Sequence, residues 1–266
     1  MRAMKSALSP GKPNAAAALP PVSMSENREV RYLHLGSEWV QGSMRIAKPY
    51  EIELEYLQRM MVWLLFVDAD SVAQRHAMQL GLGSGALTKF CHKKLHMKTS
   101  AIELNPQVVN ICRGWFKLPP DDERLLVVNA DAEVEVRNPV WAGTVDALQV
   151  DLYDHEAAAP VLDSEQFYSD CRRLLTPDGL MTVNLFGRTS SFERSLHHMA
   201  ATFGERALWA FRPTREGNTI VLAQRKPALL LRPELAERAD IVQTRWGLPA
   251  AKWLRVFKPY PIVFNP

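Results

Sequence analysis

The 266-residue sequence is poor in cysteine and in long apolar runs, and each shortage excludes a class of protein. Its three cysteines, Cys91, Cys112 and Cys171, are too few and too scattered for a disulfide framework, so we expect free thiols and a cytoplasmic location. The longest apolar run, Met60 to Val67, is far shorter than the roughly 18 residues of a membrane span, so no membrane partner is expected. The net charge of +3 is too small to indicate nucleic-acid binding by itself.

The composition that remains is that of an ordinary globular protein, with 47% hydrophobic and 23% charged residues. Positive charge is concentrated toward the end of the chain, where residues 205–266 hold eleven Lys or Arg and five Asp or Glu. We interpret this excess as a solvated face rather than as a nucleic-acid surface. The length predicts one large domain with appendages.

Changes in composition divide the chain into four parts. Residues 1–28 combine prolines and an alanine run with few large apolar side chains, which predicts a disordered segment. Residues 29–48 alternate in polarity around Gly36 and predict a small β region. Residues 49–226 form the main domain, and residues 227–266 a helical, basic extension. The aromatic side chains of that extension are expected to pack on the same domain or, alternatively, in a homodimer contact.

Strands and helices alternate through the main domain. Seven short apolar runs predict strands at 77–80, 99–104, 125–128, 145–150, 180–186, 207–211 and 219–223. Helices are expected at 50–66, 86–96, from Asn105, at 164–175 and at 190–203. This order predicts an α/β fold with a Rossmann-like, doubly wound and mainly parallel seven-stranded sheet. The short connection 213–218 makes the last two strands a hairpin, so one edge runs antiparallel.

A glycine-rich turn marks the first candidate site. Gly81, Gly83 and Gly85, with Ser84 between them, directly follow a predicted strand and precede a predicted helix. Glycines in this position allow a ligand to approach the backbone, and the helix N-terminus offers free N–H groups. The pattern is also compatible with the dinucleotide motif G-x-G-x-x-A, so a dinucleotide remains an alternative.

Carboxylates follow the next three strands at the same edge of the sheet. Glu103 ends the second strand, where a carboxylate can accept hydrogen bonds from ribose hydroxyls. Asp131 follows the third strand and Asp151 the fourth. A carboxylate placed to meet the adenine amine, together with an acidic pocket for a positive sulfonium, favours an adenosyl-sulfonium nucleoside over a dinucleotide.

Asp151 and Asp154 are the candidate catalytic residues. They lie three positions apart in the loop after the fourth strand, so both carboxylates can face one pocket. One would bind an ammonium group and the other would accept a proton, so that a free amine can attack. The alternative is that Asp154 only caps the loop. His92 and His96 have a zinc-like spacing, but no third ligand is near; we expect surface histidines and no metal.

These residues resemble the spermidine synthases, or polyamine aminopropyltransferases, a family with an S-adenosylmethionine methyltransferase-like fold. The resemblance covers about residues 31–226. The matching features are Val40-Gln41, the glycine turn 81–85, Ile102-Glu103-Leu104-Asn105, Asn129 to Ala132, Asp151 to Asp154, and the blocks 164–171 and 175–179.

The resemblance implies transfer of an aminopropyl group from decarboxylated S-adenosylmethionine to a small-molecule amine such as putrescine. It implies that Gln41, Glu103 and Asp131 hold the nucleoside. It also implies that Asp151 deprotonates the attacking amine and that Asp154 helps to hold the diamine. No permanently bound cofactor is expected, because the donor is a co-substrate.

The chain departs from the family pattern at three places. Ser84 stands where the family usually has an Asp that meets the donor's ammonium group, and His155 replaces a Pro. The family's Tyr-His pair is absent from residues 51–61. These departures indicate a divergent homologue. They leave open a methyltransferase that uses intact S-adenosylmethionine, or a catalytically weak nucleoside-binding protein.

Overall fold

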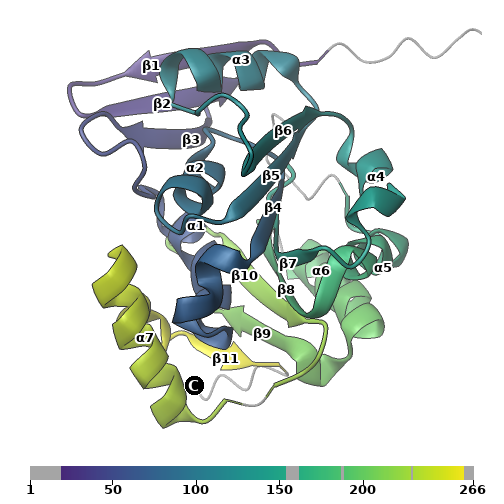
Figure 1. Ribbon diagram of the computed structural model, residues 1–266. Helices are drawn as coiled ribbons and strands as arrows, with labels where there is room; N and C mark the ends of the chain where they lie inside the picture. Colours follow the sequence, from purple (N-terminus) through teal and green to yellow (C-terminus); the bar gives the residue numbers. More distant parts are fainter. Residues whose placement is uncertain (1–18, 154–161, 187–188, 229, 261–266) are drawn as a thin grey trace, which may run out of the picture.

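A large mixed sheet forms the centre of the protein (Figure 1). The computed structural model describes residues 19–153, 162–186, 189–228 and 230–260. Eight strands lie in the order β11-β9-β10-β8-β7-β4-β5-β6. Their bounds are β4 His76–Leu80, β5 Lys98–Glu103, β6 Leu125–Asn129, β7 Val145–Val150, β8 Leu175–Leu185, β9 Leu208–Phe211, β10 Thr219–Gln224 and β11 Phe257–Pro259.

The topology confirms the predicted doubly wound sheet. Strands β4 to β8 pair in parallel, and β10 pairs antiparallel with both β8 and β9, as the short connection 213–218 predicts. The count of seven strands was one too few, because the C-terminal extension adds β11 antiparallel to β9. A three-residue strand leaves too short a pattern to be recognised in the sequence.

Helices cover both faces of this sheet (Figure 1). On one face α1 (Glu55–Met60), the 3-10 helix η1 (Met61–Phe66), α2 (Ala86–Lys93) and α7 (Arg232–Trp246) share one apolar cluster. On the other, α4 (Ala132–Glu135), α5 (Glu165–Leu174) and α6 (Thr189–Phe203) share a second. The remaining helical segments are η2 Ala69–Gln74, α3 Pro106–Trp115, η3 Pro139–Trp141, η4 Glu205–Ala207 and α8 Ala250–Trp253. No helix in the described ranges is both long enough and apolar enough to cross a lipid bilayer.

A separate antiparallel sheet precedes the main domain. It consists of β1 (Val22–Glu26), β2 (Val30–Leu35) and β3 (Val40–Arg45). The predicted disorder of residues 1–28 is therefore wrong for β1, whereas residues 1–18 lie outside the described part. Val22 and Met24 pack against the apolar cluster under α3, which stabilises a strand whose short alternation is easily overlooked beside Pro20-Pro21.

The C-terminal extension packs on the same domain, one of its two predicted positions. Leu235, Ala239 and Val242 of α7 are buried against the face that carries η1. Trp253 meets the ring of Phe211 edge-on, with 6.3 Å between ring centroids. The extension therefore completes the core of the main domain as well as its sheet.

Candidate active site

The glycine turn follows β4 and lies next to the carboxyl end of the neighbouring strand β7. Gly81, Gly83 and Gly85 all have positive φ, at 88°, 51° and 69°, which L-residues with side chains rarely adopt. A Cβ atom on Gly81 would lie 2.3 Å from the carbonyl oxygen of Asp151, so only glycine fits there. The turn therefore brings the start of α2 close to Asp151, the predicted catalytic residue at the end of β7.

Glu103 fastens this turn to the end of β5. Its two carboxylate oxygens accept hydrogen bonds from the backbone N–H groups of Leu82 (2.9 Å) and Asn105 (2.8 Å). Burial raises the pKa of Glu103, and these N–H groups oppose the rise because they favour the carboxylate form. Each oxygen keeps a second lone pair, so the carboxylate can still accept ribose hydroxyls.

Asp151 is a partly buried carboxylate with two side-chain donors. The Nδ2 of Asn184 donates to one oxygen at 2.9 Å, and the hydroxyl of Tyr56 donates to the other at 3.3 Å. Burial raises the pKa of Asp151 above its ordinary value, while both hydrogen bonds act to lower it. A carboxylate held in one orientation with a raised pKa is suited to accept a proton from a bound amine.

Asn184, which orients Asp151, is itself held by further hydrogen bonds. Asn218, in the turn between β9 and β10, donates through Nδ2 to the Oδ1 of Asn184 at 3.1 Å. This contact fixes the amide of Asn184 so that its nitrogen faces Asp151. Tyr153 donates through its hydroxyl to the carbonyl of Asn184 at 2.8 Å and also accepts from the Phe186 N–H.

Sequence reasoning missed Tyr56, Asn184 and Asn218. Tyr56 lies within residues 51–61, where the family's Tyr-His pair is absent because Leu57 follows the tyrosine in place of a histidine. The tyrosine nevertheless donates a hydrogen bond to Asp151. Asn184 left a signal, because it is a polar residue in an otherwise apolar strand end, 4% exposed. Asn218 left none, since its role depends on the hairpin geometry.

A small pocket opens between the glycine turn and α1. Its lining includes Gln41, Tyr56, Gly83, Ser84 and Asp151, so it brings together residues predicted for the donor and for catalysis. Ser84 contributes little polar surface to it. Its side chain is 2% exposed and its hydroxyl donates to the carbonyl oxygen of Ser43 in β3, at 3.1 Å.

Among the predicted residues that the structure describes, Gly85, Glu103 and Asp131 do not line this pocket. Asp131 is exposed and accepts the Glu133 N–H at 2.8 Å, so it caps α4 with one of its oxygens. Asp154 lies outside the described residues, as does His155.

One of the two histidines differs from expectation, whereas His96 is exposed as predicted. His92 is not on the surface: its ring is fully buried in α2, 3.2 Å from the carboxylate of Asp122, and burial lowers its pKa. Within the described ranges no three His, Cys, Asp or Glu side chains gather in a geometry that would hold a metal ion.

Known proteins resemble this chain over most of its length. It is 32% identical over 246 residues to the polyamine aminopropyltransferase of Chromobacterium violaceum, covering 92% of each protein. It is 33% identical to the polyamine aminopropyltransferase of Neisseria meningitidis serogroup B, covering 92% of this chain and 91% of that protein. The human eEF1A lysine and N-terminal methyltransferase is 27% identical over 189 residues, which are 65% of this chain and 26% of that protein. No family model matches the chain.

Solved structures share the fold at lower identity. A probable spermidine synthase from Corynebacterium glutamicum superposes with a TM-score of 0.69 at 16% identity, covering 91% of this chain and 93% of that one. Human methyltransferase-like protein 13, solved in complex with SAH, superposes with a TM-score of 0.66 at 23% identity, covering 73% and 93%.

Proposed function

Because the chain belongs to the polyamine aminopropyltransferase family, we propose that it transfers an aminopropyl group from decarboxylated S-adenosylmethionine to a diamine such as putrescine. Membership makes it a transferase, and the proposal concerns the identity of donor and acceptor. The single observation that carries it is Asp151, a partly buried, doubly hydrogen-bonded carboxylate beside the glycine turn.

The proposed reaction requires a neutral amine and a close approach. The amine nitrogen attacks the aminopropyl carbon bonded to the sulfonium sulfur; a C–N bond forms, the C–S bond breaks, and methylthioadenosine leaves with the bonding electrons. Asp151 takes the proton that the attacking nitrogen must lose. The raised pKa of Asp151 makes it a better base than an ordinary aspartate. Alignment of the amine with the reacting carbon would supply much of the remaining rate acceleration.

The donor is proposed to lie along the glycine turn. Glu103 would accept the ribose hydroxyls with the lone pairs that Leu82 and Asn105 leave open, and Gln41 would contact the nucleoside from β3. Asp131 would accept the adenine amine with the oxygen that does not cap α4. Asp154 would hold the distal ammonium of the diamine. A homodimer and a cytoplasmic location remain part of the proposal.

Intact S-adenosylmethionine as a methyl donor is the second candidate. Ser84 favours it, because its hydroxyl bonds to β3 and the turn offers no carboxylate to the donor's ammonium group. The absence of that negative charge also reduces repulsion of the carboxylate that distinguishes the intact donor. The Asp151 site serves either donor when the acceptor is an amine.

A thermal-shift comparison separates the two candidates. The purified protein is heated with equal concentrations of decarboxylated and of intact S-adenosylmethionine, because a ligand that binds only the folded state raises the midpoint according to its affinity. A larger shift with the decarboxylated donor supports aminopropyl transfer. A larger shift with the intact donor overturns it in favour of methyl transfer, and no shift with either overturns the nucleoside site.

A further inference from the structure

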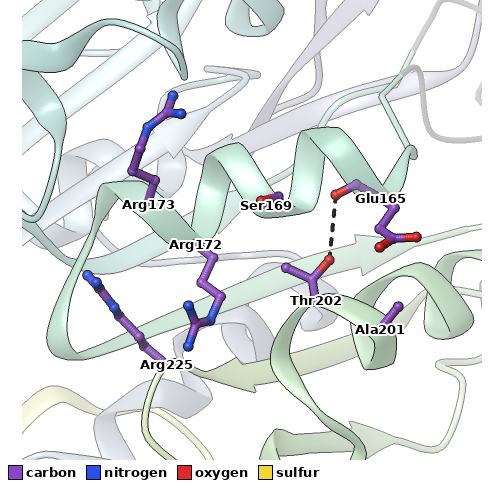
Figure 2. A pocket seen from close by; sticks show the side chains of 7 residues that line it. All are labelled: Glu165, Ser169, Arg172, Arg173, Ala201, Thr202 and Arg225. Carbon is purple, nitrogen blue, oxygen red and sulfur yellow. Dashed lines mark hydrogen bonds between the residues drawn. The ribbon is translucent and has the colours of Figure 1, made fainter.

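A second pocket lies on the opposite edge of the large sheet. It has a volume of about 400 Å³ and is formed by α5, α6 and the residue that follows β10 (Figure 2). Arg225, one of its lining residues, donates to the carbonyl of Leu175, the first residue of β8. The glycine turn lies instead at the carboxyl ends of the parallel strands, so the two pockets are separate.

The pocket contains guanidinium groups that lack a carboxylate partner. The side chain of Arg172 makes no ion pair or hydrogen bond among the described residues; its buried Nε has no acceptor, and its guanidinium lies over the ring of Phe203 at 6.0 Å. Arg225 donates a hydrogen bond from one guanidinium nitrogen to the Leu175 carbonyl. Arg173 differs, because it pairs with Asp170 at 3.2 Å.

In Figure 2 all three arginines lie at one end of the pocket; Arg172 is directed toward the side chain of Arg225, and Arg173 points away from both. Two like charges without an intervening carboxylate repel each other. An oxyanion beside these guanidinium groups would offset this repulsion. Guanidinium groups bind phosphate oxygens through paired hydrogen bonds, which makes phosphate the best match.

The other end of the pocket has the opposite character. Glu165 and Ser169 lie there, and Thr202 of α6 donates to the Glu165 carbonyl at 3.5 Å (Figure 2). A carboxylate at this end repels a second phosphate but accepts hydrogen bonds from hydroxyl groups. The lining therefore disfavours a polyanion such as a nucleic-acid strand.

We propose that this pocket binds a small phosphomonoester, with its phosphate between Arg172 and Arg225 and its hydroxyl groups toward Glu165. The volume suits a sugar phosphate, since small-molecule pockets begin at about 300 Å³. The proposal does not depend on the identity of donor or acceptor, because no residue of this pocket belongs to the active site.

Isothermal titration of the full chain with ribose 5-phosphate, inorganic phosphate and ribose tests the proposal. Ribose 5-phosphate should bind saturably and more tightly than inorganic phosphate, and ribose should not bind. Arg172→Gln and Arg225→Gln should each weaken ribose 5-phosphate about tenfold, the effect of one charge-assisted hydrogen bond. Glu165→Gln should leave inorganic phosphate unaffected and weaken the ester.

Matched variants guard against loss of structure. Arg215→Gln removes an exposed arginine from the turn after β9 and should change nothing. If a glutamine variant does not fold, Arg172→Lys and Arg225→Lys retain the charge but lose the planar pair of donors, and should weaken binding in the same direction. Absence of saturable binding, equal affinity for ester and free phosphate, unchanged affinity in folded arginine variants, or tighter binding of a single-stranded oligonucleotide would each overturn the proposal.

Discussion

We propose that the chemistry of the site rests on Asp151, whose carboxylate accepts hydrogen bonds from Asn184 and Tyr56 and whose pKa is raised by burial. We expect Asp151→Asn to lower turnover by about 10²-fold or more, because an amide cannot take the proton of the attacking amine. Affinity for the nucleoside donor should stay within a few-fold of wild type. Steady-state kinetics and donor titration measure the two quantities, and a variant that loses both together would contradict this role.

The pH dependence of the reaction belongs to the same residue. Asn184 and Tyr56 favour the ionised form of Asp151, so removing a donor raises its pKa further. The base is active above its pKa, and the acidic limb of kcat/KM should therefore move to higher pH. We expect a shift of about one pH unit for Asn184→Ala.

A graded series makes this test specific. Asn184→Asp places a second carboxylate next to Asp151 and should shift the limb further than Asn184→Ala, because like charges oppose ionisation. Asn218→Ala, which only frees the Asn184 amide to turn, should shift it less. A limb that stays in place across all three variants would show that Asp151 does not titrate in the reaction.

At the scale of the element, the glycine turn passes close to the end of β7 at Gly81. Gly81→Ala should destabilise the fold by more than about 2 kcal/mol, since it adds an overlap with the Asp151 carbonyl to the cost of a left-handed residue. Gly143→Ala is the matched control: φ is 67° but nothing lies within 4 Å of its Cβ, so only about 1–2 kcal/mol is expected. Urea unfolding of both variants should show the difference.

Ser84 ties the same turn to β3. Ser84 packs directly against Gly42 of β3, because a Cβ atom on Gly42 would lie 2.7 Å from the Ser84 Cβ. A side chain larger than serine at position 84 therefore has no room on this side. Ser84→Asp should cost about 3 kcal/mol, because it adds volume and buries a carboxylate without a donor. Ser84→Ala should cost about 1 kcal/mol, the loss of one hydrogen bond. If Ser84→Asp unfolds like wild type and binds the decarboxylated donor more tightly, the tight packing of Ser84 against β3 is wrong.

Sequence patterns predicted the elements of the site better than its contacts. The order of strands placed Glu103 and Asp151 at one edge, since polar residues after apolar runs are visible in the sequence. The contacts of Tyr56 and Asn218 with this centre depend on how α1 and the β9–β10 turn fold back on the sheet. No residue spacing in the sequence predicts that Tyr56 and Asn218 come close to Asp151 and Asn184.

At the scale of the whole molecule, the C-terminal extension belongs to the core that supports the site. Trp253→Ala should lower the free energy of unfolding by about 3–5 kcal/mol, because the side chain is 3% exposed and packs on Phe211. Trp39→Ala is its control, 67% exposed, with an expected change within about 0.5 kcal/mol. Equal effects in denaturant unfolding would contradict the packing of the extension.

The overall architecture was predictable because its strands and helices are bounded by strong local signals, such as Gly81 after β4 and Pro106 at the start of α3. The first and last strands were not. β1 lies in a segment of low apolar content and β11 has three residues; both form because partner strands β2 and β9 pair with them.

Product analysis tests the proposed activity most directly. The protein is incubated with decarboxylated S-adenosylmethionine and putrescine, and separately with intact S-adenosylmethionine and putrescine, and the products are identified by mass spectrometry. We expect methylthioadenosine and spermidine in equal amounts from the first mixture, and neither from Asp151→Asn. Formation of S-adenosylhomocysteine from the second mixture, with no methylthioadenosine from the first, would contradict aminopropyl transfer.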